Sequence, residues 1–241
     1  GASFHGEADD DEAGTSIAGV GDVNGDGYDD IAIAAPRSAA GGSRRGQVYL
    51  IFGGPTGWAM GTDLSGADAS FVGEQDDDYA GTSVAGAGDL DGDGYDDLLI
   101  GAPYSDEGPW VYDGGQTYVV FGKPSGWAMG VSLADADASF YGNVSNADRT
   151  GEVVAGAGDV DGDGYDDLLI GCPRFNSSGN DDGVIYLIHG SPAGWAMDVD
   201  LLGADTAFVG ETASDRAGET LLGLGDLDGD GYDDFAIGAP D

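Results

Sequence analysis

The sequence predicts an all-β protein in which one four-stranded unit is repeated along the chain. Three observations support this fold class. An acidic nine-residue loop recurs four times, beginning at residues 22, 89, 159 and 226. Short apolar or glycine-rich runs flank each copy, and no segment shows a sustained helical period. The 47 glycines fall at fixed places in each unit, which indicates turns and close strand contacts rather than disorder.

Each unit begins with two strands on either side of an acidic turn. The first, strand D, ends in Gly and is expected at 3–6, 70–73, 139–142 and 207–210. The second, strand A, is rich in Gly and Ala, as in residues 81–88. Small side chains suit a place where several sheets crowd around an axis, so strand A is expected to be the innermost strand.

The acidic loop follows strand A and leads into strand B, an apolar run that ends at a proline. Strand B is expected at 31–34, 98–100, 168–170 and 235–237. After a variable loop comes strand C, expected at 47–52, 116–121 and 184–188 and buried on both faces. A Gly-Trp-Ala-Met connector then leads to the next strand D, and we expect Trp58, Trp127 and Trp195 to pack between neighbouring sheets.

Four antiparallel strands with a loop between A and B describe one blade of a β-propeller. The expected division is strand D of a preceding or closing blade at 1–6, blade 1 at 7–73, blade 2 at 74–142, blade 3 at 143–210, and the first half of blade 4 at 211–241. This partial ring has three full blades and 15 strands in all, one strand fewer than four complete blades would have. Unpaired edges favour either further chain that closes the ring or self-association between copies.

Each acidic loop has the composition of a calcium site. Oxygen-bearing side chains at loop positions 1, 3, 5 and 9 suit a hard cation, the Gly at position 6 allows a sharp turn, and the Tyr at position 7 offers its carbonyl. The expected ligands are Asp22, Asn24, Asp26, Tyr28 and Asp30; Asp89, Asp91, Asp93, Tyr95 and Asp97; Asp159, Asp161, Asp163, Tyr165 and Asp167; and Asp226, Asp228, Asp230, Tyr232 and Asp234.

Two other interpretations of the loop are weaker. A solvated Asp-Gly turn explains one copy better than four copies with the same carboxylate spacing. An EF-hand needs a glutamate at position 12 and flanking helices, whereas here position 12 is an isoleucine inside strand B, namely Ile33, Ile100, Ile170 or Ile237. Position 8 is not expected to coordinate the ion, so Asp93→Ala should weaken calcium binding more than Asp96→Ala.

Strands that end in Phe-Gly (52–53, 121–122) and Gly-Ala-Pro (101–103, 238–240) around these loops resemble FG-GAP repeats. Such repeats build the propeller of integrin α subunits and occur in many bacterial surface or secreted proteins. The resemblance implies about four Ca²⁺ sites at the loop positions given above, an extracellular or cell-surface location, and adhesion to a protein ligand. The chain departs from the seven-bladed integrin ring in its number of blades.

Composition excludes several functions. The chain has 46 acidic and 7 basic residues, a formal charge of −39, so nucleic acid and anionic membrane surfaces would repel it. Cys172 is the only cysteine, which rules out an internal disulfide. His5 and His189 fall within strand patterns and are expected to be packing or edge residues. With no nucleophile and base paired in the sequence, we expect no enzymatic activity.

Ligand binding is expected at the B-to-C loops, which vary most between units. They carry Arg44, Arg45, Trp110 and Arg174, residue types typical of binding hot spots. Two alternatives stay open. One is a structural protein that self-assembles through its incomplete blades into an oligomer or filament. The other is a carbohydrate-binding or carbohydrate-active propeller, for which the three acids at 76–78 are candidates for a pair of catalytic carboxylates.

Overall fold

The computed structural model describes residues 1–106, 112–142, 148–176 and 181–240. Its secondary structure is almost entirely β, as the sequence predicts. Blade 1 contains β2 (Ser16–Gly21), β3 (Asp30–Ala35), β4 (Gln47–Ile51) and β6 (Ala69–Val72). Blade 2 contains β7 (Ser83–Gly88), β8 (Asp97–Ala102), β9 (Gln116–Val120) and β11 (Ala138–Tyr141). Blade 3 contains β12 (Val153–Gly158), β13 (Asp167–Cys172), β14 (Val184–Ile188) and β16 (Thr206–Val209).

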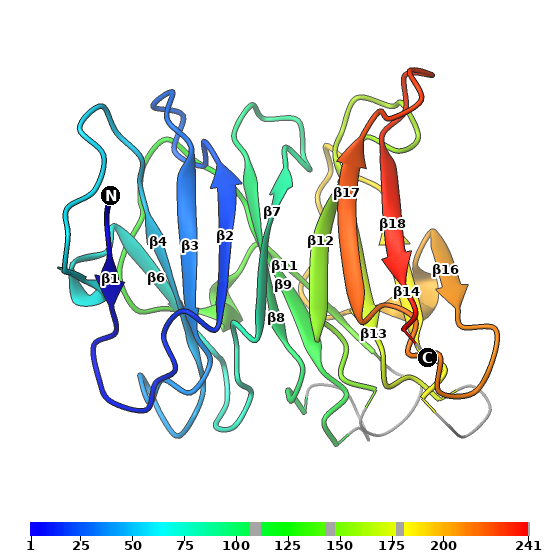
Figure 1. Ribbon diagram of the computed structural model, residues 1–241, viewed down its shortest axis with the longest axis horizontal. Helices are drawn as coiled ribbons and strands as arrows, with labels where there is room; N and C mark the ends of the chain where they lie inside the picture. Colours follow the sequence, from blue (N-terminus) through cyan, green and yellow to red (C-terminus); the bar gives the residue numbers. More distant parts are fainter. Residues whose placement is uncertain (107–111, 143–147, 177–180, 241) are drawn as a thin grey trace.

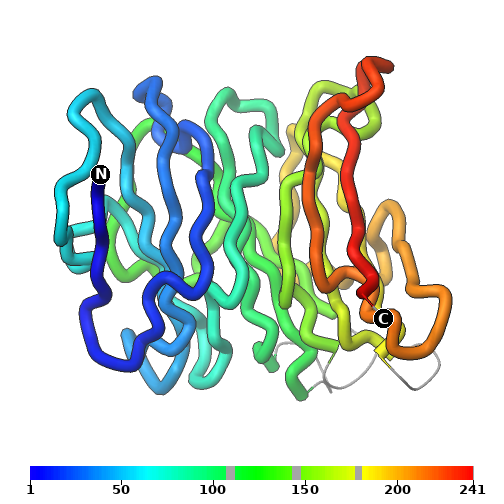
Figure 2. The backbone as a smooth tube through the Cα atoms, in the orientation of Figure 1, coloured from blue at the N-terminus to red at the C-terminus, as the bar shows by residue number. Residues whose placement is uncertain are grey.

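Two strands, β17 (Thr220–Gly225) and β18 (Asp234–Gly238), pair as the A and B strands of a fourth unit. Strand β1 (Phe4–His5) takes the place of the preceding strand D. The sheets stand side by side in chain order, like the blades of a propeller, and the described residues form no closed ring (Figure 1). The backbone trace shows the same order from the N-terminal to the C-terminal sheet (Figure 2).

The described chain contains 18 strands rather than the expected 15. The three additional strands have two residues each and lie in the connectors: β5 (Thr62–Asp63), β10 (Val131–Ser132) and β15 (Val199–Asp200). Each pairs in parallel with strand D of the preceding unit, as β10 does with β6. A 3-10 turn follows each of them, at Leu64–Gly66, Leu133–Asp135 and Leu201–Gly203. The connectors therefore join neighbouring blades along their outer edges.

The tryptophan of each connector packs against the preceding blade. The ring of Trp127 meets Phe71 of β6 edge to face, with centroids 6.3 Å apart, and also meets Phe52 at 5.9 Å. Trp195 meets Phe140 at 5.6 Å, and Trp58 meets Phe4 at 6.0 Å. These contacts match the expected packing between sheets, and edge-to-face pairs add to the free energy gained by burying the rings.

The A strands lie next to one another at the inner edges of the sheets, where there is room only for small residues. A Cβ atom on Gly86 of β7 would lie 2.9 Å from the carbonyl oxygen of Gly19 in β2, and one on Gly156 of β12 would lie 2.7 Å from that of Gly86. The expected glycine-rich inner strand is therefore observed. Strands B and C form the core: Leu99, Tyr118 and Leu169 are fully buried.

The antiparallel order places the connections on two opposite edges of the array. The acidic A-to-B loops and the C-to-D connectors lie on one edge, whereas the B-to-C loops and D-to-A turns lie on the other (Figure 1). No helix in the described part of the chain is long and apolar enough to cross a bilayer.

Candidate metal sites

The main chain of each acidic loop folds around its own carboxylates. In the second loop, Asp89 accepts N–H groups from Gly92, Asp93 and Gly94 at 2.8–3.0 Å. Asp91 accepts from Asp93 at 3.1 Å, and Asp93 accepts from Tyr95 at 3.0 Å. The third and fourth loops repeat all of these bonds, and the first loop repeats all but the one from the glycine at position 4, with Asn24 in place of Asp91. The sequence of alternating acids and glycines thus fixes the side chains of positions 1, 3 and 5.

In the first three loops, position 9 is held from two sides and is buried. Asp97 is 0% exposed; its Oδ2 accepts the N–H of Leu90 and its Oδ1 accepts that of Gly122, both at 2.8 Å. Asp30 accepts from Val23 and Gly53, and Asp167 from Val160 and Gly190, in the same way. The glycine of each Phe-Gly pair, or of His189-Gly190 in blade 3, therefore binds strand C to the acidic loop. In the fourth loop Asp234 accepts from Leu227 at 2.9 Å.

Burial of these carboxylates is electrostatically costly. Burial raises the pKa of Asp97 to about 8 and that of Asp30 to about 6, although N–H donors oppose the shift and nearby acids add to it. The pKa of Asp167 is raised for the same main reason. Among the described residues, no Lys or Arg forms an ion pair with a loop carboxylate. A divalent cation would supply the positive charge that these groups lack.

Carboxylates of three loops converge tightly enough for one ion. Oxygens of Asp89, Asp91 and Asp97 lie within 4.8 Å of one another, and the same holds for positions 1, 3 and 5 of the third and fourth loops. Oxygens bound to one calcium ion at 2.3–2.6 Å lie no more than about 5 Å apart. In the first loop, position 3 is an amide and the described carboxylates form no group this tight. The hard oxygen donors fit calcium.

The tyrosines at position 7 and the acids at position 8 reach the neighbouring loop. The Tyr95 ring lies over Gly25 so closely that a Cβ there would overlap it, and Tyr165 and Tyr232 cover Gly92 and Gly162 likewise. The Oδ2 atoms of position 8 accept the N–H of position 1 in the preceding loop: Asp96 from Asp22 at 2.7 Å, Asp166 from Asp89 at 2.8 Å, and Asp233 from Asp159 at 3.2 Å. The sequence analysis missed this role of position 8.

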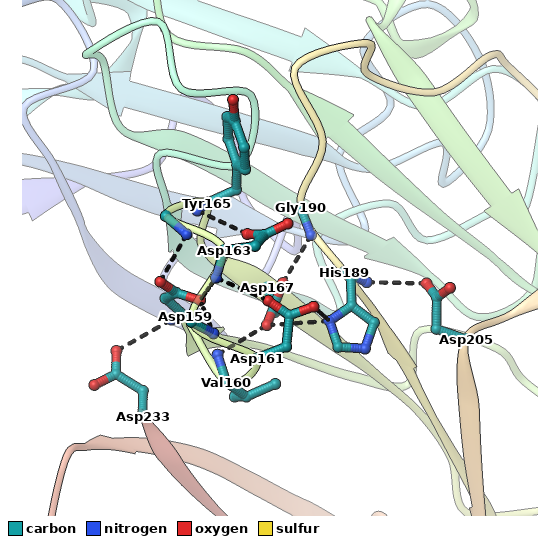
Figure 3. A network of polar contacts seen from close by, with 12 residues as sticks. Asp159, Val160, Asp161, Asp163, Tyr165, Asp167, His189, Gly190, Asp205 and Asp233 are labelled. Atoms are coloured by element: carbon teal, nitrogen blue, oxygen red, sulfur yellow. Dashed lines mark hydrogen bonds and ion pairs between the residues drawn. The ribbon is translucent and has the colours of Figure 1, made fainter. Parts of the chain in front are cut away.

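The third loop has one neighbour whose contacts the sequence did not predict. His189, expected as a packing or edge residue, follows the end of β14, and its Nδ1 lies 3.0 Å from Oδ2 of Asp161 and 3.6 Å from Oδ2 of Asp167 (Figure 3). The signal was present in the alignment of the units, because His189-Gly190 stands where the other blades have Phe52-Gly53 and Phe121-Gly122.

The expected partner-binding residues lie on the opposite edge and are engaged within the chain. Nε of Arg44 lies 2.7 Å from Asp77, and Nε of Arg45 lies 2.9 Å from Asp76. Nε of Arg174 lies 3.2 Å from Glu152. Arg44 remains half exposed, so its guanidinium still faces solvent. Trp110 lies outside the described residues.

The acids at 76–78 are engaged by these pairs and by burial. Asp78 is buried, and its carboxylate accepts the N–H of Gln75 at 2.7 Å. The two exposed acids pair with arginines, which stabilises the turn before β7 against the B-to-C loop of blade 1. This arrangement gives the three acids structural partners in the turn.

Comparison with known proteins agrees with the fold. The FG-GAP repeat family profile matches residues 13–51, 80–120, 150–188 and 218–241. Integrin alpha-PS2 of Drosophila melanogaster is 34% identical over 238 residues, covering 96% of this chain and 15% of the relative. Integrin alpha pat-2 of Caenorhabditis elegans is 33% identical, covering 97% and 18%. Integrin alpha-V of Gallus gallus is 32% identical, covering 96% and 20%.

This chain thus spans a fifth or less of the length of these relatives. The family match begins just before each strand A and covers the acidic loop and strand B, extending in the first three units through strand C. It therefore includes all four candidate metal loops. Because the matched segments make up more than half of the residues, the chain belongs to the FG-GAP repeat family.

Proposed function

We propose that this chain is a calcium-stabilised, non-enzymatic module for extracellular adhesion or protein binding. The observation that carries the proposal is the buried aspartate at loop position 9, exemplified by Asp97, beside carboxylates of the same loop. Such a group is costly unless a cation or a proton neutralises it. The resemblance to integrin α repeats supports calcium, the cell-surface location and the protein ligand.

Side chains at positions 1, 3, 5 and 9 and the carbonyl at position 7 would hold the ion. A bound calcium ion would offset the mutual repulsion of the loop carboxylates and link strands A, B and C through position 9. The hydrogen bonds already present orient Asp89, Asp93 and Asp97, so few side-chain rotamers remain to be lost on binding.

The contacts of the buried loop aspartates support the absence of enzymatic activity. The most strongly buried loop acids, such as Asp97 and Asp167, accept main-chain N–H groups on both oxygens, which fits structural anchoring better than proton transfer. A protein ligand would contact the edge that carries Arg44, Arg45 and Arg174, together with Trp110, because its loops differ most between blades.

Counting bound ions tests the calcium proposal. Native mass spectrometry of the folded chain in calcium acetate is expected to show up to four Ca²⁺ ions. Asp163→Ala should remove one ion, because position 5 is a ligand, whereas Asp29→Ala, which changes an exposed position 8, should remove none. A folded chain without bound calcium, or an equal loss in both variants, would contradict the proposed sites.

A further inference from the structure

We propose that the third acidic loop is also a transition-metal site, in which Nδ1 of His189 and the carboxylates of Asp161 and Asp167 bind Zn²⁺ or an ion of similar preference. This inference rests on the proposed cation site of the same loop, because it shares two carboxylates with it. The three ligand atoms lie within 4.8 Å of one another and come from two elements, the loop itself and the end of strand C (Figure 3).

The separations of these atoms suit a small ion. Nδ1 lies 3.0 Å from Oδ2 of Asp161 and 3.6 Å from Oδ2 of Asp167. Ligand atoms at about 2.0–2.2 Å from a tetrahedral zinc ion lie roughly 3.3–3.6 Å apart, so small shifts would complete the geometry. The two carboxylates and the imidazole fill three positions of a tetrahedral ion and leave the fourth for water or for another loop oxygen.

The imidazole nitrogen of His189 lies at ion-pair distance from two carboxylates but is not aligned for a hydrogen bond to either. Nδ1 is buried and makes no hydrogen bond in the described structure, although two carboxylates face it. Buried polar atoms usually make a well-aligned hydrogen bond, which Nδ1 makes with neither carboxylate. A metal ion bound by all three atoms would satisfy the nitrogen and both carboxylates together.

The acceptors around the site are fixed in place. Asp167 is 0% exposed, and Gly190 and Val160 donate to its two oxygens at 2.7 and 2.9 Å. The main-chain N–H of His189 donates to Asp205 at 3.1 Å, which anchors the residue that carries the imidazole. A preorganised ligand set of this kind loses little entropy when the ion binds.

The neighbouring blades show that this ligand is specific to the third loop. Phe52 and Phe121 occupy the equivalent place, and their rings lie against Trp127 and Trp195. Their loops therefore offer oxygen alone, which suits calcium, whereas imidazole with carboxylate suits zinc, manganese and cobalt. Calcium and zinc are expected to compete for the third loop only.

Nitrogen NMR of the whole chain tests this directly. The chain has two histidines, so ¹⁵N-histidine labelling gives signals from two imidazoles, each with two ring nitrogens, and His5 serves as the internal control. Zinc chloride should shift the Nδ1 resonance of His189 while leaving His5 in place, and excess calcium should reverse the shift. An unmoved His189 signal at saturating zinc, or an equal shift of both histidines, would overturn the proposal.

The matched variant is His189→Phe, which introduces the residue of the other two blades. Zinc affinity should fall at least tenfold, while calcium affinity stays within twofold of the parent chain. Unchanged zinc affinity would overturn the inference. Normal calcium binding with no zinc effect at His189 would remove the zinc site and leave the proposed function intact. Conversely, a zinc shift at His189 in a chain that binds no calcium would support the zinc site and refute the calcium function.

Discussion

The carboxylate of Asp96 accepts a hydrogen bond, 2.7 Å long, from the main-chain N–H of Asp22 and so joins the second acidic loop to the first. Asp22 is the residue whose own carboxylate folds the first loop, through the N–H groups of Asp26 and Gly27. The same bond recurs between the next two pairs of loops. Each of the first three loops is thus held both by its own carboxylates and by the unit that follows it.

Asp96→Ala should therefore lower the calcium affinity of the first loop and reduce the free energy of unfolding by about 1.5–3 kcal/mol, the usual contribution of a hydrogen bond to a charged group. Asp29→Ala is the matched control, because it removes the same charge from the same loop position, where the side chain is exposed. Urea unfolding of both variants measures the difference, and equal losses would show that the bond between blades contributes nothing.

Position 5 should behave differently from position 8. Asp93→Ala removes an expected ligand and the acceptor for the N–H of Tyr95, so calcium affinity at the second loop should fall by at least tenfold. Asp96→Ala should leave the second loop nearly unaffected, because its carboxylate points to the first. Calcium titration calorimetry of the two variants distinguishes the loops. A loss at the second loop that is the same for both would refute the ligand assignment.

Two adjacent glycines that follow strand C of blade 1, Gly53 and Gly54, should respond very differently to alanine. Gly53 donates to Asp30 at 2.7 Å, and a Cβ on it would overlap the carbonyl of Asp29. Gly53→Ala should therefore reduce the free energy of unfolding by about 1–3 kcal/mol, as overpacking does. A Cβ on Gly54 meets nothing within 4 Å, so Gly54→Ala should change stability by less than about 0.5 kcal/mol. Thermal unfolding measures the difference, and equal melting temperatures for Gly53→Ala and Gly54→Ala would contradict this account.

Metal-stripped protein should lose stability as the pH rises. The pKa of Asp97 is about 8 and that of Asp30 about 6 in the folded chain, against an ordinary 3.8. The folded state therefore keeps protons that the unfolded chain releases, so the free energy of unfolding falls between about pH 4 and pH 8. Saturating calcium should abolish this fall, because the ion replaces the protons.

Urea unfolding of stripped protein at pH 5, 6.5 and 8 measures the slope. Asp97→Asn should reduce the decrease in the free energy of unfolding with pH, whereas Asp29→Asn, at an exposed position, should leave that decrease unchanged. If the free energy of unfolding of the stripped protein rises from pH 5 to pH 8, the pKa values of the buried carboxylates are not raised in the folded state, and this prediction is wrong.

The repeat made the blades and the acidic loops between strands A and B predictable, whereas the contacts between blades were not. Periodic features such as the acidic loop and the apolar strands B and C recur in register, so four copies reinforce one another. Strands of two residues, such as β10, leave no periodic pattern. The hydrogen bond from the N–H of Asp22 to the carboxylate of Asp96 joins residues 74 positions apart. It cannot be predicted from the sequence, because the two residues meet only when the blades pack. The contacts of His189 with Asp161 and Asp167 could not be predicted either, because these residues belong to the loop that precedes strand B.

Thermal unfolding of the intact chain with and without calcium tests the central claim most directly. A ligand that binds only the folded state at 100 times its dissociation constant stabilises it by about 2.7 kcal/mol for each site. Calcium should therefore raise the melting temperature substantially above that of stripped protein, and magnesium at the same concentration should restore it poorly, because magnesium demands a smaller octahedral site. Identical melting curves for the stripped and calcium-loaded chain would contradict the account.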